Sequence, residues 1–202
     1  MKLLVLLAMT ATSLVTNAQI STISPGTKAP DFSLPSVDGK EISFASFPEA
    51  KGYIVVFTCN TCPVAKKYEE RINNLHKKYA PLGYPVIAIN PNDPDVVSGD
   101  SFDEMKTRAK SKQYPFPYLY DKGQTVTDAY GARVTPHVFL VQKKNNQATV
   151  VYTGAIDNDP DNGAGKTVYI DQAINDISKG NSLSLASTKA IGCSVKRKKS
   201  DL

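Results

Sequence analysis

The chain has 202 residues, 41% of them hydrophobic, and a formal net charge of +5. This length suits one domain with a substantial core. The positive excess is concentrated in the run Lys196-Arg197-Lys198-Lys199, which no aromatic or glycine motif accompanies, so we exclude nucleic acid as a partner.

Residues 1–18 have the pattern of a signal peptide. Lys2 supplies the positive charge, and residues 3–15 form an apolar stretch that is too short for a comfortable membrane span. Small residues precede Gln19, where we expect cleavage. The protein is therefore predicted to be exported, to the periplasm or as a secreted protein, with no membrane anchor after cleavage. Such compartments permit disulfides.

Two short strands are expected first, at residues 32–34 and 41–44, joined as a hairpin by Asp38-Gly39. A buried strand follows at residues 54–57, where the chain reads Ile-Val-Val-Phe. It leads through Cys59-Asn-Thr-Cys62 into an amphipathic helix that begins at Pro63 and ends near residue 80. Proline is favoured in the first turn of a helix because its missing N–H is not needed there.

Strands and helices alternate along the rest of the chain. Ser101 is the expected N-cap of a helix that starts at Phe102. The other expected elements are strands at 85–90, 117–120, 138–141 and 149–152, a short helix at 124–130, and a final helix at 166–179. This order predicts an α/β domain over residues 19–180, with a mixed central sheet covered by helices on both faces. Residues 181–202 are expected to be a solvated, basic C-terminal tail.

The two cysteines of the Cys59-Asn-Thr-Cys62 motif lie at a strand-to-helix turn. The N-terminus of a helix stabilises a thiolate and can lower a cysteine pKa from about 8.5 into roughly the 3.5–7.5 range. A zinc site would need a second ligand pair, and the remaining Cys193, His76 and His137 are not paired in the sequence, so no metal is expected. A structural disulfide is a further alternative. The context favours a redox-active pair.

Four segments of the sequence resemble a known family. They are Phe-Thr-Cys-Asn-Thr-Cys-Pro at 57–63, Tyr-Gly-Ala-Arg-Val-Thr-Pro-His-Val-Phe-Leu at 130–140, Tyr-Thr-Gly-Ala-Ile-Asp at 152–157 and Gly-Cys-Ser-Val-Lys at 192–196. Together they are similar to the redoxin branch of the thioredoxin superfamily, closest to a peroxiredoxin-like subgroup of exported thiol–disulfide oxidoreductases. The resemblance implies a thioredoxin-like fold with an N-terminal β-hairpin extension.

The resemblance also implies roles for individual residues. Cys59 would be an exposed nucleophile and Cys62 its recessed resolving partner. Pro136 matches the cis-proline of the family, and Thr135 before it would pair with the backbone of a bound peptide. The implied function is exchange of a Cys59–Cys62 dithiol or disulfide with protein clients and an unidentified redox partner, without a cofactor.

Two other functions stay open. In the peroxiredoxin register Cys62 would attack peroxide, although Cys59 then stands where that family places a threonine. Arg133 could supply a guanidinium to a thiolate, and His137 could tune one. The third alternative is a redox-inactive binding protein with this fold.

Cys193 is the odd cysteine of a chain that is expected to be exported. It is a possible third thiol, a possible intermolecular link, or a free tail thiol. Because residues 182–199 show no clear periodicity and few apolar side chains, we expect this segment to lie apart from the other two cysteines. The acidic stretch at 157–163 resembles a calcium loop only partly, so we expect an ordinary loop there.

Overall fold

The computed structural model of the protein describes residues 21–198. The expected signal peptide and Lys199 lie outside these residues. A five-stranded sheet forms the centre in the order β5-β4-β3-β7-β8. Its strands are β3 (Gly52–Phe57), β4 (Val86–Asn90), β5 (Tyr118–Tyr120), β7 (His137–Lys144) and β8 (Gln147–Gly154). β3, β4 and β5 are parallel, β7 is antiparallel to β3, and β8 is antiparallel to β7. The predicted mixed α/β sheet is confirmed.

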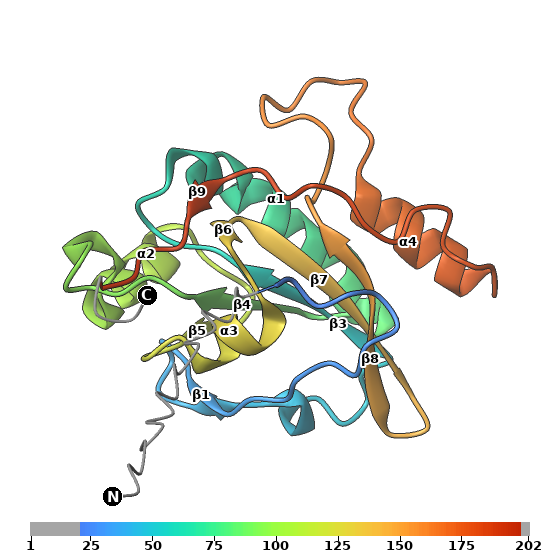
Figure 1. Ribbon diagram of the computed structural model, residues 1–202, viewed down its shortest axis with the longest axis horizontal. Coiled ribbons are helices and arrows are strands. Elements are labelled where there is room, and N and C mark those ends of the chain that lie inside the picture. The colour runs from blue at the N-terminus through green and yellow to red at the C-terminus, as the bar shows by residue number, and fades with distance from the viewer. Residues whose placement is uncertain (1–20, 199–202) are drawn as a thin grey trace, which may run out of the picture.

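Helices cover both faces of this sheet (Figure 1). α1 (Pro63–Tyr79), α2 (Phe102–Ser111) and α4 (Tyr169–Ser178) pack on one face, and α3 (Thr125–Tyr130) packs on the other with the N-terminal segment. Side chains along a strand alternate between faces, so Ile54 and Val56 of β3 join the first core while Val55 and Phe57 join the second. Because both sides of β3 are covered, the whole strand is buried, which explains its continuous apolar run.

The N-terminal hairpin is present but shorter than expected. β1 (Leu34–Pro35) pairs with β2 (Glu41–Ile42), and Gly39 at the turn has φ +85°, which glycine adopts without strain. The second strand stops early because Phe44 begins the 3-10 helix η1 (Phe44–Ser46). There the Phe44 ring stacks on Tyr53 of β3, with 4.3 Å between ring centroids.

Most predicted element boundaries agree with the structure. α1 begins at Pro63, and Ser101 caps α2 by accepting a hydrogen bond from the Glu104 N–H at 3.4 Å. Two short 3-10 helices, η2 (Ala80–Leu82) and η3 (Ser98–Asp100), follow α1 and precede α2 respectively. α4 begins at Tyr169, later than the predicted residue 166, because Val168 forms a β-bridge with Asp157.

The C-terminal segment differs most from the prediction. Instead of extending into solvent, it crosses the molecule from α4 and forms β9 (Cys193–Ser194), which pairs antiparallel with β6 (Val134–Thr135) (Figure 1). The Lys196 N–H donates to Asn92 Oδ1 at 2.9 Å, and Arg197 forms an ion pair with Asp128 of α3. The expectation of a solvated tail is therefore wrong for residues 192–198, because acidic and amide side chains lie opposite the basic run.

Within residues 21–198, no helix combines the length and the apolar character needed to cross a membrane.

Candidate active site

The Cys59-to-Cys62 turn joins the end of β3 to the start of α1. Cys62 is the N-cap of α1, where its Sγ accepts a hydrogen bond from the Ala65 N–H at 3.5 Å. Both cysteines are buried, with exposures of 3% for Cys59 and 4% for Cys62. The expected exposure of Cys59 is therefore wrong. Thr135 and the partly buried Cys193 pack against this turn and restrict the access of solvent to it.

The disulfide of the structure joins Cys62 to Cys193. The two Cα atoms lie 5.9 Å apart although 131 positions separate the residues in sequence. Cys59 has a free thiol. The structure thus departs from the expected Cys59–Cys62 pairing and from the expected distance of Cys193 from the site. The cause is the pairing of β9 with β6, which holds Cys193 beside the start of α1.

Thr135 contacts all three cysteines. Its Oγ1 lies 3.1 Å from Cys59 Sγ, its carbonyl oxygen lies 3.3 Å from Cys62 Sγ, and its backbone is in register with Cys193. The Thr135–Pro136 peptide bond is cis, as the resemblance implied. β6 therefore places one residue, Thr135, beside all three cysteines.

The surroundings of Cys59 make its thiolate less favourable than the sequence suggested. Burial raises the pKa of the Cys59 thiol above its ordinary value, and the negative charge of Asp100 raises it further. Hydrogen bonds from Thr135 and from the backbone N–H groups of Cys62 and Thr61 act in the opposite direction and lower the pKa. Burial and the nearby carboxylate outweigh these hydrogen bonds.

Asp100 is a buried residue at this site that the sequence analysis did not identify. Its Oδ1 accepts a hydrogen bond from the Asn60 N–H at 2.6 Å. Its Oδ2 accepts hydrogen bonds from Thr61 Oγ1 and from Asn92 Nδ2, both at 2.7 Å. Hydrogen bonds to a carboxylate are stronger than those between neutral groups. Asp100 therefore fixes the residues between the two cysteines.

The Asn60 side chain adds a second connection. Its Oδ1 accepts a hydrogen bond from the Tyr118 hydroxyl at 3.0 Å, and its Nδ2 donates to the Gly99 carbonyl oxygen at 2.9 Å. Burial raises the pKa of Tyr118 well above its ordinary value, so the phenol keeps the proton that it donates. The only sequence signal for this network was an Asp directly before the helix cap Ser101, which is too common to identify a site.

His137 and Arg133 lie close in sequence to Thr135 but make other contacts. His137 Nε2 lies 3.1 Å from Thr153 Oγ1, and the imidazole ring lies 4.5 Å from the Phe139 ring. Burial lowers the pKa of His137 to about 4, so the ring is neutral near pH 7. The Arg133 side chain is exposed. The backbone carbonyl oxygen of Arg133 accepts a hydrogen bond from the Val195 N–H at 3.0 Å. A tuning role for either residue stays a prediction.

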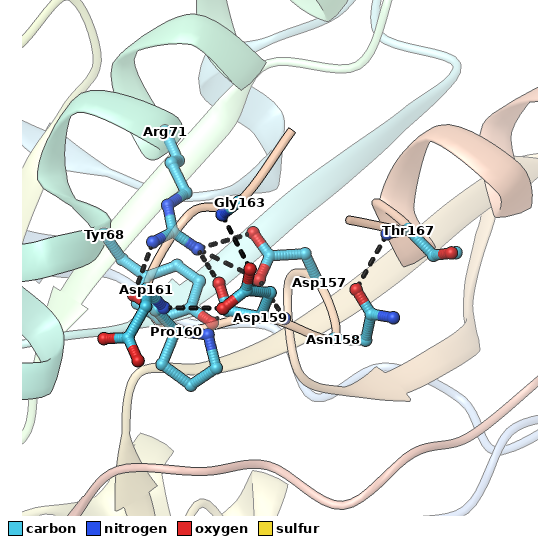
Figure 2. A network of polar contacts seen from close by, with 9 residues as sticks. All are labelled: Tyr68, Arg71, Asp157, Asn158, Asp159, Pro160, Asp161, Gly163 and Thr167. Carbon is cyan, nitrogen blue, oxygen red and sulfur yellow. Dashed lines mark hydrogen bonds and ion pairs between the residues drawn. The ribbon is translucent and has the colours of Figure 1, made fainter. Parts of the chain in front are cut away.

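The acidic loop after β8 is held by an arginine (Figure 2). Arg71 Nη1 donates to both carboxylate oxygens of Asp157 at 3.0 and 2.8 Å and to the Asp159 carbonyl oxygen at 2.7 Å, while Nη2 donates to the Pro160 carbonyl oxygen at 2.6 Å. The guanidinium thus neutralises oxygens that could otherwise attract a metal ion. In the described range 21–198, no cluster of three His, Cys, Asp or Glu side chains is placed to hold a metal.

Two solved structures are similar to the chain over most of its length. One is a hypothetical protein of Sinorhizobium meliloti 1021, with 32% identity and a TM-score of 0.79 over 89% of this chain and 97% of that one. The other is an uncharacterized conserved protein of Geobacillus kaustophilus, with 32% identity and a TM-score of 0.79 over 87% of this chain and 93% of that one. Neither title states an activity.

Curated relatives carry the name thiol-disulfide oxidoreductase ResA. The relative from Halalkalibacterium halodurans is 28% identical over 65% of this chain and 69% of its own length. The chain spans 64% of the length of four Bacillus relatives with the same name. These names and the family confirm the expected enzyme class, a thiol–disulfide oxidoreductase.

A family model described as the AhpC/TSA family matches residues 25–150, which is more than half of the chain. The match includes the Cys59-to-Cys62 turn and the cis-proline, and it ends before β9. The chain therefore belongs to the AhpC/TSA family, in the redoxin branch of the thioredoxin superfamily.

Proposed function

We propose that the protein is an exported thiol–disulfide oxidoreductase that acts on protein clients through the Cys59–Cys62 pair, which exchanges internally with the Cys62–Cys193 disulfide. The observation that carries the proposal is the packing of the free Cys59 thiol with the Cys62–Cys193 disulfide in one buried cluster. Thiol–disulfide exchange proceeds by attack of a thiolate on a disulfide sulfur, so a free thiol beside a disulfide supplies both reactants.

The first step is an internal exchange. The Cys59 thiol loses its proton, and the thiolate attacks Cys62 Sγ. A Cys59–Cys62 bond forms, the Cys62–Cys193 bond breaks, and the electron pair leaves with the Cys193 sulfur, which then takes up a proton. The overall oxidation state does not change. The product has an oxidised Cys59–Cys62 pair that accepts electrons from a client dithiol, and the reverse sequence reduces a client disulfide.

Thr135 assists this step as a hydrogen-bond donor. Its hydroxyl lies 3.1 Å from Cys59 Sγ and can donate to the thiolate that forms there. Because burial and Asp100 raise the pKa of Cys59, little thiolate is present near neutral pH. The internal exchange should therefore become faster as the pH rises.

The proposed location rests on two features. The charged and apolar pattern of residues 1–18 supports export, and the disulfide suits an oxidising compartment. Cell fractionation of a tagged full-length chain tests the location. The variant Leu6→Arg, which interrupts the apolar stretch, is compared with the native chain. Retention of both proteins in the cytoplasm would contradict export.

Insulin reduction by single cysteine variants tests the activity. We expect Cys59→Ser and Cys62→Ser each to lose at least about a hundredfold of the rate, a change of roughly 2.7 kcal/mol in barrier. Cys193→Ser should retain activity, because the working pair remains. Full activity of Cys59→Ser would contradict the proposal. A different result would favour the redox-inactive alternative. In that case the native chain shows no redox activity, and the double variant Cys59→Ser, Cys62→Ser still binds a partner.

Peroxide reduction is a second candidate, and the Cys62–Cys193 disulfide favours it. A Cys62 thiolate would attack the peroxide, leaving a Cys62 sulfenic acid and releasing an alcohol or water. The Cys193 thiol would then condense with the sulfenic acid, releasing water and forming the observed disulfide. Peroxide consumption with dithiothreitol as reductant separates the two functions. A peroxidase requires Cys62, and its Cys59→Ser variant still reacts with peroxide in the first step. Client exchange requires both Cys59 and Cys62.

A further inference from the structure

The C-terminal segment lies on the protein as an extended peptide would lie in the site. β9 adds a strand to β6, with Cys193 in register with Thr135 and Ser194 with Val134. The Val195 N–H extends this pairing by donating to the Arg133 carbonyl oxygen at 3.0 Å. Strand addition to an exposed backbone edge is a general mode of peptide recognition. The sulfur of this added strand is already joined to Cys62.

The residue before the cysteine has no room for a side chain. A Cβ built on Gly192 would lie 2.5 Å from the carbonyl carbon of Thr135 and 3.0 Å from the nitrogen of Pro136. These atoms belong to the backbone and cannot move aside as a flexible side chain can. Gly192 is not among the residues with positive φ, so lack of space, rather than backbone conformation, requires glycine here.

The residues after the cysteine are held by backbone hydrogen bonds and by charge. The Lys196 carbonyl oxygen accepts a hydrogen bond from Gln124 Nε2 at 2.8 Å. Arg197 Nη1 donates to Gln124 Oε1 at 2.9 Å, and its other guanidinium nitrogen pairs with Asp128. Lys198 pairs with Asp95. Lys196 is thus held through its backbone, while acidic and amide groups receive the basic side chains four and five positions after Cys193.

We propose that residues 192–198 occupy the client site as an internal copy of the segment that the enzyme prefers. That segment is extended, has glycine directly before the reacting cysteine, and has basic residues four and five positions after it. The inference rests on the proposed function and specifies its substrate class. Reduction of the Cys62–Cys193 bond removes the covalent anchor of the internal copy and lets a client segment replace it.

Peptides that carry an activated cysteine test this preference. The cysteine of Gly-Cys-Ser-Val-Lys-Arg-Lys is joined to thionitrobenzoate and mixed with the reduced full-length Cys193→Ser protein. A protein thiolate attacks the peptide sulfur, which forms a mixed disulfide and releases thionitrobenzoate. The neighbouring thiolate then displaces the peptide thiol and leaves the Cys59–Cys62 disulfide. The absorbance of released thionitrobenzoate measures the first step.

Two altered peptides separate the two recognition features. With alanine in place of glycine, we expect the rate to fall by at least about tenfold at low peptide concentration. With glutamate in place of the last two basic residues, we expect a fall of at least about threefold that high salt removes, since salt screens exposed charges. Equal rates for all three peptides would overturn the inference. Glutathione joined to thionitrobenzoate is the reference compound. If the protein failed to react with this compound as well, the result would contradict the proposed function instead of the inference.

The native tail offers a second test. Gly192→Ala should displace the internal copy, so that the fraction of Cys62–Cys193 disulfide at a fixed glutathione ratio falls by at least about threefold. Gly165→Ala is the matched control, because a Cβ there meets no atom within 4 Å and its φ is not positive. Mass spectrometry of the alkylated proteins measures the pairing. An unchanged disulfide fraction in Gly192→Ala would contradict the fit at Gly192.

Discussion

The carboxylate of Asp100 accepts a hydrogen bond from the backbone N–H of Asn60 at 2.6 Å, although the two residues lie 40 positions apart in sequence. This contact joins η3, the 3-10 helix before α2, to the turn between Cys59 and Cys62. It has two opposing effects on the site. The hydrogen bond stabilises the turn, while the negative charge raises the pKa of the nearby Cys59 thiol.

Replacing Asp100 should separate these effects. In Asp100→Asn the charge is lost, so the pKa of Cys59 falls and its alkylation reaches half-maximal rate at a lower pH than in the native protein. The loss of charge-assisted hydrogen bonds should also lower the free energy of unfolding, by about 1–3 kcal/mol. Iodoacetamide labelling of the reduced proteins across a pH series, followed by mass spectrometry, measures the first effect, and urea unfolding measures the second.

The matched control is Asp103→Asn, which removes an exposed carboxylate from the first turn of α2. It should leave the alkylation profile of Cys59 unchanged. An identical profile in Asp100→Asn would show that the carboxylate does not control the thiol.

The Cys62–Cys193 disulfide should add substantial stability. It joins residues 131 positions apart, and the chain-entropy relation gives up to about 5 kcal/mol for a loop of this length. We expect dithiothreitol to lower the free energy of unfolding of the native chain by about 3–5 kcal/mol. Urea unfolding with and without reductant measures this difference. In Cys193→Ser the same reductant should have a much smaller effect, and equal sensitivity in both proteins would show that another bond is responsible.

His137 should make stability depend on pH. Burial lowers the pKa of His137 to about 4, below its ordinary value of 6.5, so the unfolded chain binds the proton more readily than the folded one. The stabilisation is complete above pH 6.5 and is lost as the pH falls towards 4, by up to about 3 kcal/mol. Urea unfolding at pH 7 and pH 4.5 should show this loss in the native protein and a smaller one in His137→Gln.

The variant His76→Gln provides the comparison for that pH series, since His76 is only half-buried. Burial also lowers the pKa of His76, but less than that of His137, so His76→Gln should change the pH dependence much less than His137→Gln does. If His137→Gln kept the full loss between pH 7 and pH 4.5, other groups would be responsible for it.

The Arg71–Asp157 ion pair should contribute far more than the exposed pair beside it. Arg71→Met leaves the Asp157 carboxylate buried without its cation, which costs about 3–5 kcal/mol of unfolding free energy. Lys67→Met removes the exposed Lys67–Asp161 pair from the same helix and should cost less than about 1 kcal/mol. Thermal unfolding of both variants measures the contrast, and equal losses would contradict the importance of burial.

Much of the fold followed from local sequence patterns. The buried strand 54–57, the proline that starts α1 and the serine that caps α2 each carry a signal within a few residues, and each lies where it was predicted. The strand–turn–helix context also placed the two cysteines of the motif correctly. These features depend on periodicity and on helix ends, which neighbouring residues determine.

The errors concern contacts between distant parts of the chain. Nothing near Cys193 indicates that a two-residue strand will pair with Thr135, because such pairing leaves no periodic pattern. The acidic partners of the basic tail, Asp128 of α3 and Asp95, lie far away in sequence. The prediction that Cys59 is exposed was wrong for the same reason, since the residues that pack against the turn are Thr135 and Cys193. The sequence shows these residues, but only tertiary packing determines which partners they contact.

The long separation between Cys62 and Cys193 also orders events during synthesis. At about 5–20 residues per second, Cys59 and Cys62 are made on the order of ten seconds before Cys193. During that interval the motif can oxidise only within itself or with another molecule. The pairing found in the finished protein must therefore form last, either by late oxidation or by transfer of an earlier bond to the newly arrived cysteine.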